Sequence, residues 1–64
     1  MQTRQQIADE KSGLDERLAA LAEIISGEHF HDIPRLERLR MTRQKTIMTE
    51  YSQVLKDRLD ATPE

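Results

Sequence analysis

Apolar residues recur along the chain in two helical patterns that a short break separates. The first pattern, over residues 3–26, places apolar residues at intervals of seven, three or four: Ile7, Leu14, Leu18, Leu21 and Ile25. In a heptad frame these residues take positions d and a, and Lys11 is a charged residue at position a. This spacing predicts a long amphipathic helix.

The second pattern, over residues 34–60, predicts another long helix whose apolar residues share one broad face. At about 100° per residue these residues fall within a sector of about 140°: Leu36, Met41, Ile47, Met48, Tyr51, Val54, Leu55 and Leu59. Arg40, Gln44 and Arg58 fall near the centre of the same sector. Burial of such groups costs several kcal/mol unless they find partners. The face is therefore expected to meet something polar, either another copy of the chain or an anionic ligand.

The break between the two patterns has the residues of a tight connection. Gly27 is expected to end the first helix in the left-handed conformation that often caps helices. Asp32 is expected to cap the second helix, with Pro34 in its first turn. Because the loop over residues 27–33 is short, the helices are expected to be antiparallel neighbours. Gly13 weakens the first helix by about 1 kcal/mol relative to Ala and indicates a close helix crossing or a slight bend.

Length and composition favour self-association. The 64 residues are expected to form a single domain, 1–64, and a chain of this size buries only about 60% of its unfolded surface. Cysteine is absent, so neither a disulfide nor a thiolate metal site can stabilise the fold. The aromatic residues are Phe30 and Tyr51 alone. The expected fold is an all-α antiparallel two-helix hairpin that assembles into a homo-oligomeric bundle, as a homodimer or a homotetramer.

Charge is distributed unevenly, although the net charge is only −2. Residues 9–28 contain six acids and two bases, whereas residues 35–45 contain five bases and one acid. One interpretation is an acidic helix that lies beside a basic one. The other is that part of the basic cluster holds an anion. The two interpretations are compatible with each other.

Several functional classes lack their sequence signatures. The polar N-terminus has no apolar signal region, and no stretch reaches the roughly 18 apolar residues of a membrane span, so a cytoplasmic location is expected. No nucleophile constellation or glycine-rich phosphate loop is visible, which argues against an enzyme and against a bound cofactor. His29 and His31 do not have the spacing of a zinc site. The pI near 5.6 and the few aromatic residues argue against general nucleic-acid binding.

The polar residues on the second apolar face, with Tyr51 beside them, form a line that allows two roles. In a structural role, Gln44 would fix the register of a bundle, and Arg58 would pair with Asp9 or Glu10 of the first helix. In a functional role, the line would grip a small anionic ligand at an oligomer interface. Arginine would then supply forked donors to phosphate, and an aromatic ring would supply a stacking surface.

Between positions 7 and 59 the chain has an ordered set of residues at distinctive spacings: Glu10-Lys11, Leu14, Leu18, Ile24-Ile25, Phe30, Ile33, Leu39-Arg40-Met41-Thr42-Arg43-Gln44, Met48, Glu50-Tyr51, Val54-Leu55 and Arg58-Leu59. This order resembles a widespread group of small phage proteins. That group is similar to the anti-CBASS sponge proteins, which assemble into tetramers and sequester cyclic dinucleotide signals such as 3′3′-cGAMP without cleaving them. The chain departs from such binders in its scarce aromatic surface.

The resemblance implies a phage immune-evasion protein of the host cytoplasm that sequesters a cyclic dinucleotide at an oligomer interface. The ligand-binding residues expected on this basis are Arg40, Arg43, Gln44, Tyr51, Phe30 and His29. The arginines would hold the phosphates, and Gln44 and Tyr51 would hydrogen-bond or stack. Phe30 and His29 would close the site from the hairpin tip. The alternative is a structural or regulatory hairpin whose apolar face docks on a partner protein.

Overall fold

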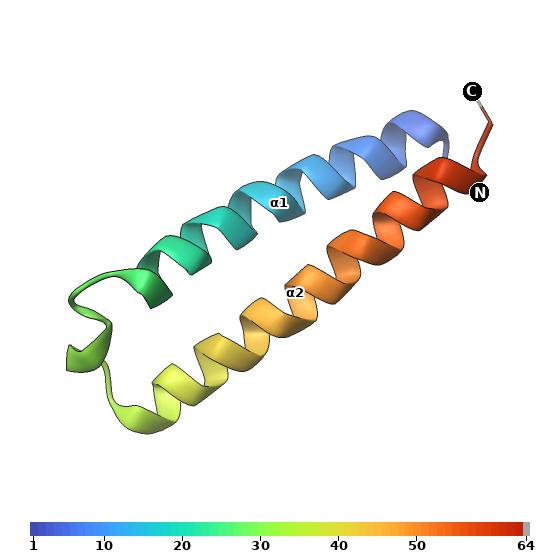
Figure 1. Ribbon diagram of the computed structural model, residues 1–64. Helices are drawn as coiled ribbons and strands as arrows, with labels where there is room; N and C mark the ends of the chain where they lie inside the picture. Colours follow the sequence, from blue (N-terminus) through green and yellow to red (C-terminus); the bar gives the residue numbers. More distant parts are fainter. Residues whose placement is uncertain (64) are drawn as a thin grey trace.

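The computed structural model is an antiparallel helical hairpin, described over residues 1–63 (Figure 1). Helix α1 spans Arg4–Ser26, the short 3₁₀ helix η1 spans Phe30–Asp32, and helix α2 spans Arg35–Ala61. The N- and C-termini lie together at one end of the hairpin, and η1 forms the tip at the other (Figure 1). This arrangement confirms the predicted all-α hairpin. Within residues 1–63 no helix is long and apolar enough to cross a membrane.

Helix α1 begins with a reciprocal cap between Thr3 and Gln6. The Gln6 backbone N–H donates to Thr3 Oγ1 at 3.1 Å, and the Thr3 backbone N–H donates to Gln6 Oε1 at 2.8 Å. This capping box satisfies two of the amide groups that the first turn of a helix leaves unpaired. The local sequence therefore sets the start of the helix.

The end of α1 differs from the expected left-handed cap. Gly27 is extended, with φ −76° and ψ 157°, and its N–H donates to the Ile24 carbonyl at 3.2 Å. A Cβ at this position would lie 3.2 Å from the Glu23 carbonyl oxygen and 3.3 Å from the Ile24 carbonyl oxygen. Glycine is therefore favoured here by the close approach of two carbonyl groups, and the prediction of a left-handed Gly27 was wrong.

The start of α2 also differs from the prediction. Asp32 ends η1 and does not cap α2, because Ile33 and Pro34 separate it from the first helical residue, Arg35. Ile33 is extended, at φ −79° and ψ 137°, which is the conformation that a following proline favours. Pro34 occupies the cap position without a side-chain hydrogen bond. Because of the proline, α2 begins two residues later than it would if Asp32 were its cap.

The hydrophobic core lies in the half of the hairpin nearest the termini. Ile7, Leu14 and Leu55 are buried, and Met48 and Leu59 pack against them. The apolar residues nearer the tip, which include Leu18, Leu21, Ile25 and Met41, are only half-buried. The two ribbons in Figure 1 correspondingly lie closer together at the termini than at η1. A single hairpin therefore leaves its tip half incompletely packed.

The broad apolar sector of α2 is divided between two faces. Met41, Met48, Leu55 and Leu59 are half-buried or buried on the face toward α1, whereas Leu36, Ile47, Tyr51 and Val54 remain 62%, 52%, 41% and 50% exposed. The exposed residues share their face with the three polar residues of the sector. We call this set the open strip: Leu36, Arg40, Gln44, Ile47, Tyr51, Val54 and Arg58.

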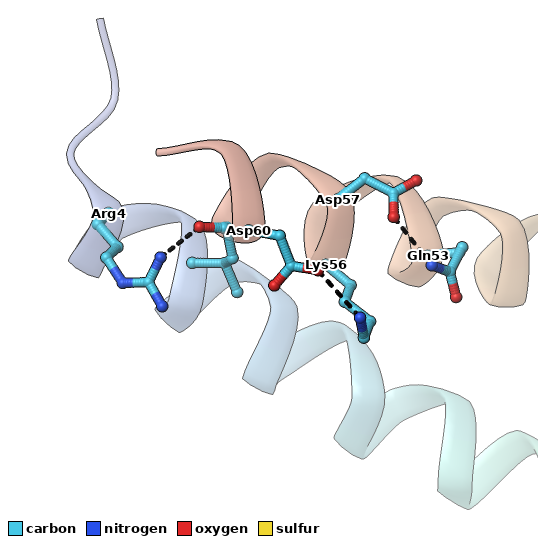
Figure 2. Close-up of polar contacts among 6 residues, drawn as sticks. Arg4, Gln53, Lys56, Asp57 and Asp60 are labelled. Atoms are coloured by element: carbon cyan, nitrogen blue, oxygen red, sulfur yellow. Dashed lines mark hydrogen bonds and ion pairs between the residues drawn. The ribbon is translucent and has the colours of Figure 1, made fainter. Parts of the chain in front are cut away.

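The two ends of the chain are joined by Arg4. Its guanidinium Nη1 donates to the Leu59 carbonyl (Figure 2) and, at 3.1 Å, to the Thr62 carbonyl. The last turn of a helix leaves carbonyl groups unpaired and carries partial negative charge. The cation of α1 therefore caps the C-terminus of α2. Lys56 and Asp60 form an ion pair one turn apart on the outer surface, at 3.0 Å (Figure 2).

Gly13 does not mark a close crossing of the two helices. A Cβ at Gly13 would meet Arg17 Nη1 of the same helix at 3.9 Å, an ordinary contact. A polar group instead occupies the middle of the helix interface. Asp15 accepts from Lys11 Nζ at 2.6 Å and from Ser52 Oγ of α2 at 2.6 Å. Lys11, the charged residue of the heptad pattern, is thus neutralised within its own helix.

Candidate ligand-binding surface on helix α2

A shallow hollow of about 340 Å³ lies on the tip half of α2. We call it the Arg40 hollow, and it is lined by Arg40, Arg43, Gln44, Ile47 and Met48. These residues are three or four positions apart, so their side chains project from consecutive turns toward one side of the helix. The hollow brings together three of the six residues expected to bind a ligand. Two apolar side chains, Ile47 and Met48, complete its lining.

The cations around the Arg40 hollow are weakly neutralised. Arg40 Nη1 lies 3.7 Å from Glu37 Oε2, and both side chains are exposed, so water screens this pair. Among residues 1–63, no ion pair is formed by the other four bases of residues 35–45, which are Arg35, Arg38, Arg43 and Lys45. The basic cluster therefore retains charge for an anion.

Ion pairs do not join the acidic part of α1 to the basic part of α2. Each ion pair or histidine–carboxylate contact in the described part of the chain connects residues at most four positions apart: Lys11–Asp15, Glu28–His29, His29–Asp32, Glu37–Arg40 and Lys56–Asp60. The interpretation of an acidic helix beside a basic one thus receives no support from direct pairing. The alternative, that the cluster holds an anion, stays open.

Arg38 faces the interior more than its neighbours do. Its side chain is half-buried, and its Nε is buried without a hydrogen-bond partner. A buried donor left unpaired costs free energy, usually about 1–3 kcal/mol. This unpaired group lies in the same under-packed tip half as the Arg40 hollow. In the single hairpin, the tip half therefore lacks a hydrogen-bond partner for Arg38 as well as full apolar packing.

Tyr51 lies outside the Arg40 hollow. It is seven residues beyond Gln44, about 10 Å further along the helix, and its hydroxyl donates a hydrogen bond to the Glu10 carboxylate of α1. This hydrogen bond is the main reason that the pKa of Glu10 falls below its ordinary value and the pKa of Tyr51 rises above its own. The ring is thereby held in one position on the open strip.

Arg58 has a different partner from the one predicted. It donates to Gln2 Oε1 at 2.6 Å, whereas Asp9 accepts from Gln5 of its own helix at 2.8 Å. Glu10 is taken by Tyr51, although the nearby charge of Arg58 still contributes to lowering the pKa of Glu10. The expected pairing of Arg58 with Asp9 or Glu10 is therefore wrong, because closer partners on α1 and α2 satisfy both acids.

His29 and Phe30 lie at the hairpin tip and do not line the Arg40 hollow. His29 is 86% exposed, with Nδ1 3.4 Å from Asp32 Oδ2, and Phe30 is half-buried at the start of η1. Within residues 1–63, no three His, Asp or Glu side chains are grouped so that they could hold a metal ion. In a single chain, therefore, the six expected ligand residues form three separate groups.

A second hollow, of about 380 Å³, lies near the termini and is not among the sites expected from the sequence. It is lined by Arg4, Gln5, Ala8 and Leu59. The guanidinium of Arg4 already caps the carbonyls at the end of α2. This hollow therefore offers less free charge to an anion than the Arg40 hollow does. The only sequence signal at the site is an arginine in the first turn of the helix.

Comparison with known proteins identifies the family of the chain. A family model described as Sequestin matches residues 1–61, nearly the whole chain. No curated protein and no solved structure matches. The family name denotes sequestration, which is binding without catalysis, and this agrees with the prediction that the chain is not an enzyme.

Proposed function

The chain belongs to the Sequestin family, and we propose that it sequesters a cyclic dinucleotide signal, such as 3′3′-cGAMP, without cleaving it. Family membership implies a sequestering binding protein. The identity of the ligand is the proposal, and the Arg40 hollow is the observation that carries it. In this proposal the protein is encoded by a phage and counters anti-phage signalling of the CBASS type in the host cytoplasm.

The chemistry of the Arg40 hollow suits a phosphodiester joined to a base. Arg40 and Arg43 offer planar forked donors to phosphate oxygens, and such charge-assisted hydrogen bonds are about twice as strong as neutral ones. Gln44 carries both a donor and an acceptor, which is what the edge of a base requires. Ile47 and Met48 provide apolar surface on which a base or ribose could lie.

The openness of the hollow supports binding between copies of the chain. Small-molecule sites usually bury at least about 70% of their ligand, whereas one face of one helix covers a single side of it. A second copy packed over the hollow would supply the missing wall. The proposal therefore includes a homodimer or a homotetramer, with Tyr51, Phe30 and His29 as candidates to complete the site.

Thermal unfolding with a nucleotide panel tests the proposed ligand class. The panel contains 3′3′-cGAMP, another cyclic dinucleotide, a linear nucleotide pyrophosphate and a mononucleotide. At a concentration 100 times its Kd, a ligand adds about 2.7 kcal/mol to the free energy of unfolding. For a domain of this size that is a rise in Tm of more than about 10 °C. The ligand should be recovered intact from the denatured complex.

Two variants connect the shift to the hollow. Arg40→Ala combined with Arg43→Ala should abolish the shift and leave the mass of the oligomer unchanged. Lys56→Ala removes one cation from the outer surface of the terminal half and serves as the control, with the shift retained. Absence of a shift for every cyclic dinucleotide would contradict the proposed ligand class. A shift with the linear pyrophosphate alone would move the proposal to another nucleotide class.

The open strip also suits a different function, docking on a partner protein. Four large apolar side chains are exposed along it. A docking module should remain monomeric at micromolar concentration and show no shift with any nucleotide. The two functions therefore give opposite results in the same two measurements.

A further inference from the structure

The hairpin exposes more surface than a self-sufficient domain of its mass. Its accessible surface is 5,064 Å², whereas a folded monomer of 7.5 kDa exposes about 4,200 Å². The excess of about 800 Å² is the share that one partner buries in an interface of standard size. The radius of gyration is 14.5 Å, against about 10.7 Å for a compact chain of this length. The rod therefore has the surface that one further interface needs.

The open strip has the pattern of a helix–helix interface. Its members Arg40, Gln44, Ile47, Tyr51, Val54 and Arg58 alternate in steps of four and three residues. Each directly precedes a residue on the face toward α1, namely Met41, Lys45, Met48, Ser52, Leu55 and Leu59. Helix α2 therefore carries two heptad seams about 100° apart. In the single hairpin only one of the two is covered.

The charge of the hairpin selects the orientation of a second copy. The tip half, residues 17–45, has six bases and four acids, a net charge of +2. The terminal half, residues 1–16 and 46–64, has four bases and eight acids, a net charge of −4. These values sum to the −2 of the whole chain. Antiparallel pairing sets the positive half of one copy against the negative half of the other, whereas parallel pairing sets like charges together.

The register follows from the extent of the open strip. In an antiparallel twofold dimer, a residue lies opposite the partner residue for which the two residue numbers add up to a constant. The strip runs from Leu36 to Arg58, so it covers itself fully when the axis passes near Ile47. In this register Tyr51 of one copy lies opposite Arg43 and Gln44 of the other.

We propose that two copies pair antiparallel through their open strips about an axis near Ile47. Each ligand site then combines Arg40, Arg43 and Gln44 of one copy with Tyr51 of the other. Tyr51 lies about 10 Å along the helix from Gln44 of its own chain and does not line the hollow of that chain, and its bond to Glu10 presents the ring on the open strip. The shared site rests on the proposed function, whereas the pairing does not.

Cysteine cross-linking tests the pairing on a chain that has no cysteine of its own. A disulfide requires Cα atoms about 4.4–6.8 Å apart. Under mild oxidation Ile47→Cys should form a covalent dimer. Leu36→Cys and Val54→Cys should cross-link no faster than the same chains do in denaturant. A mixture of Arg40→Cys and Val54→Cys chains should form the mixed dimer. Self-linking at Leu36→Cys or Val54→Cys would indicate parallel pairing and overturn the proposal, as would a monomeric native chain with no link at any position.

Complementation tests the shared site, with 3′3′-cGAMP as the probe. Arg43→Ala and Tyr51→Leu should each abolish binding alone. A one-to-one mixture of the two should recover about a quarter of the wild-type sites, because half of randomly mixed dimers are mixed and each contains one intact site of two. No recovery, with the wild-type chain binding normally, overturns the shared site. If the wild-type chain does not bind 3′3′-cGAMP, the proposed ligand fails, and cross-linking still decides the pairing.

Discussion

The hydroxyl of Tyr51 on α2 donates a hydrogen bond to the carboxylate of Glu10 on α1. This contact crosses the hairpin on the same side as the open strip. The bond lowers the pKa of Glu10, and Gln2 and the charge of Arg58 act in the same direction. It raises the pKa of Tyr51 above its ordinary value of 10.0. The open strip is therefore anchored to α1 through its one aromatic side chain.

Removal of this hydroxyl should be visible in the titration of Glu10. In Tyr51→Phe we expect the pKa of Glu10 to rise toward its ordinary value of 4.5. Because the folded pKa of Glu10 is lowered, the contact stabilises the fold above the unfolded pKa and is lost as pH falls through the folded pKa. The stability difference between wild type and Tyr51→Phe should therefore close in acid. NMR titration of the carboxylates checks this, and the pKa of Asp15, which Tyr51 does not contact, should stay unchanged.

Two adjacent residues of α2 should respond differently to truncation. Leu55 is fully buried, so Leu55→Ala should lower the free energy of unfolding by about 2–5 kcal/mol. Val54 is 50% exposed, so Val54→Ala should have an effect within about 0.5 kcal/mol in the monomer. At concentrations where the open strips pair, Val54→Ala should become destabilising. Urea unfolding at several protein concentrations measures both effects, and a concentration-independent Val54→Ala would count against pairing through the open strip.

The two glycines should respond to alanine with opposite signs. Gly13→Ala should stabilise the chain by about 1 kcal/mol, because its Cβ meets only a flexible arginine at 3.9 Å within a helix. Gly27→Ala should destabilise it, because its Cβ would press on two backbone carbonyls at 3.2 and 3.3 Å. Thermal unfolding of the two variants under one set of conditions is the test. A loss of stability in Gly13→Ala would indicate a contact at Gly13 that the single hairpin lacks.

Arg4 should stabilise the end of α2 although it belongs to α1. Arg4→Ala removes the donors to the carbonyls of Leu59 and Thr62 and should cost about 1–2 kcal/mol. Amide hydrogen exchange should rise in the last turn of α2 as well as at the N-terminus. Lys56→Ala is the matched control, because it removes an exposed cation that pairs within its own helix. A change confined to the first turn of α1 would show that the cap contributes nothing.

Local features of the structure were predictable where neighbouring residues decide them. The two helices and their apolar faces follow from spacing, because helix periodicity is a property of the chain itself. The conformation of Gly27 and the role of Asp32 were not predicted correctly. Both depend on the short η1 turn, whose hydrogen bonds replace the expected caps. The partner of Arg58 also depends on which residues of α1 lie beside it.

The sequence by itself determined two amphipathic helices, the short connection that makes them antiparallel, and a basic stretch with polar residues set among apolar ones. Only the tertiary structure decided how the apolar sector of α2 is divided. A helix the width of α1 covers about half of that sector, so Met48 and Leu55 turn inward while Ile47 and Val54 remain exposed. The packing also left Arg40 and Gln44 beside that exposed half. The reason is that periodicity places a residue on a face, whereas the position of a neighbouring helix determines whether that face is covered.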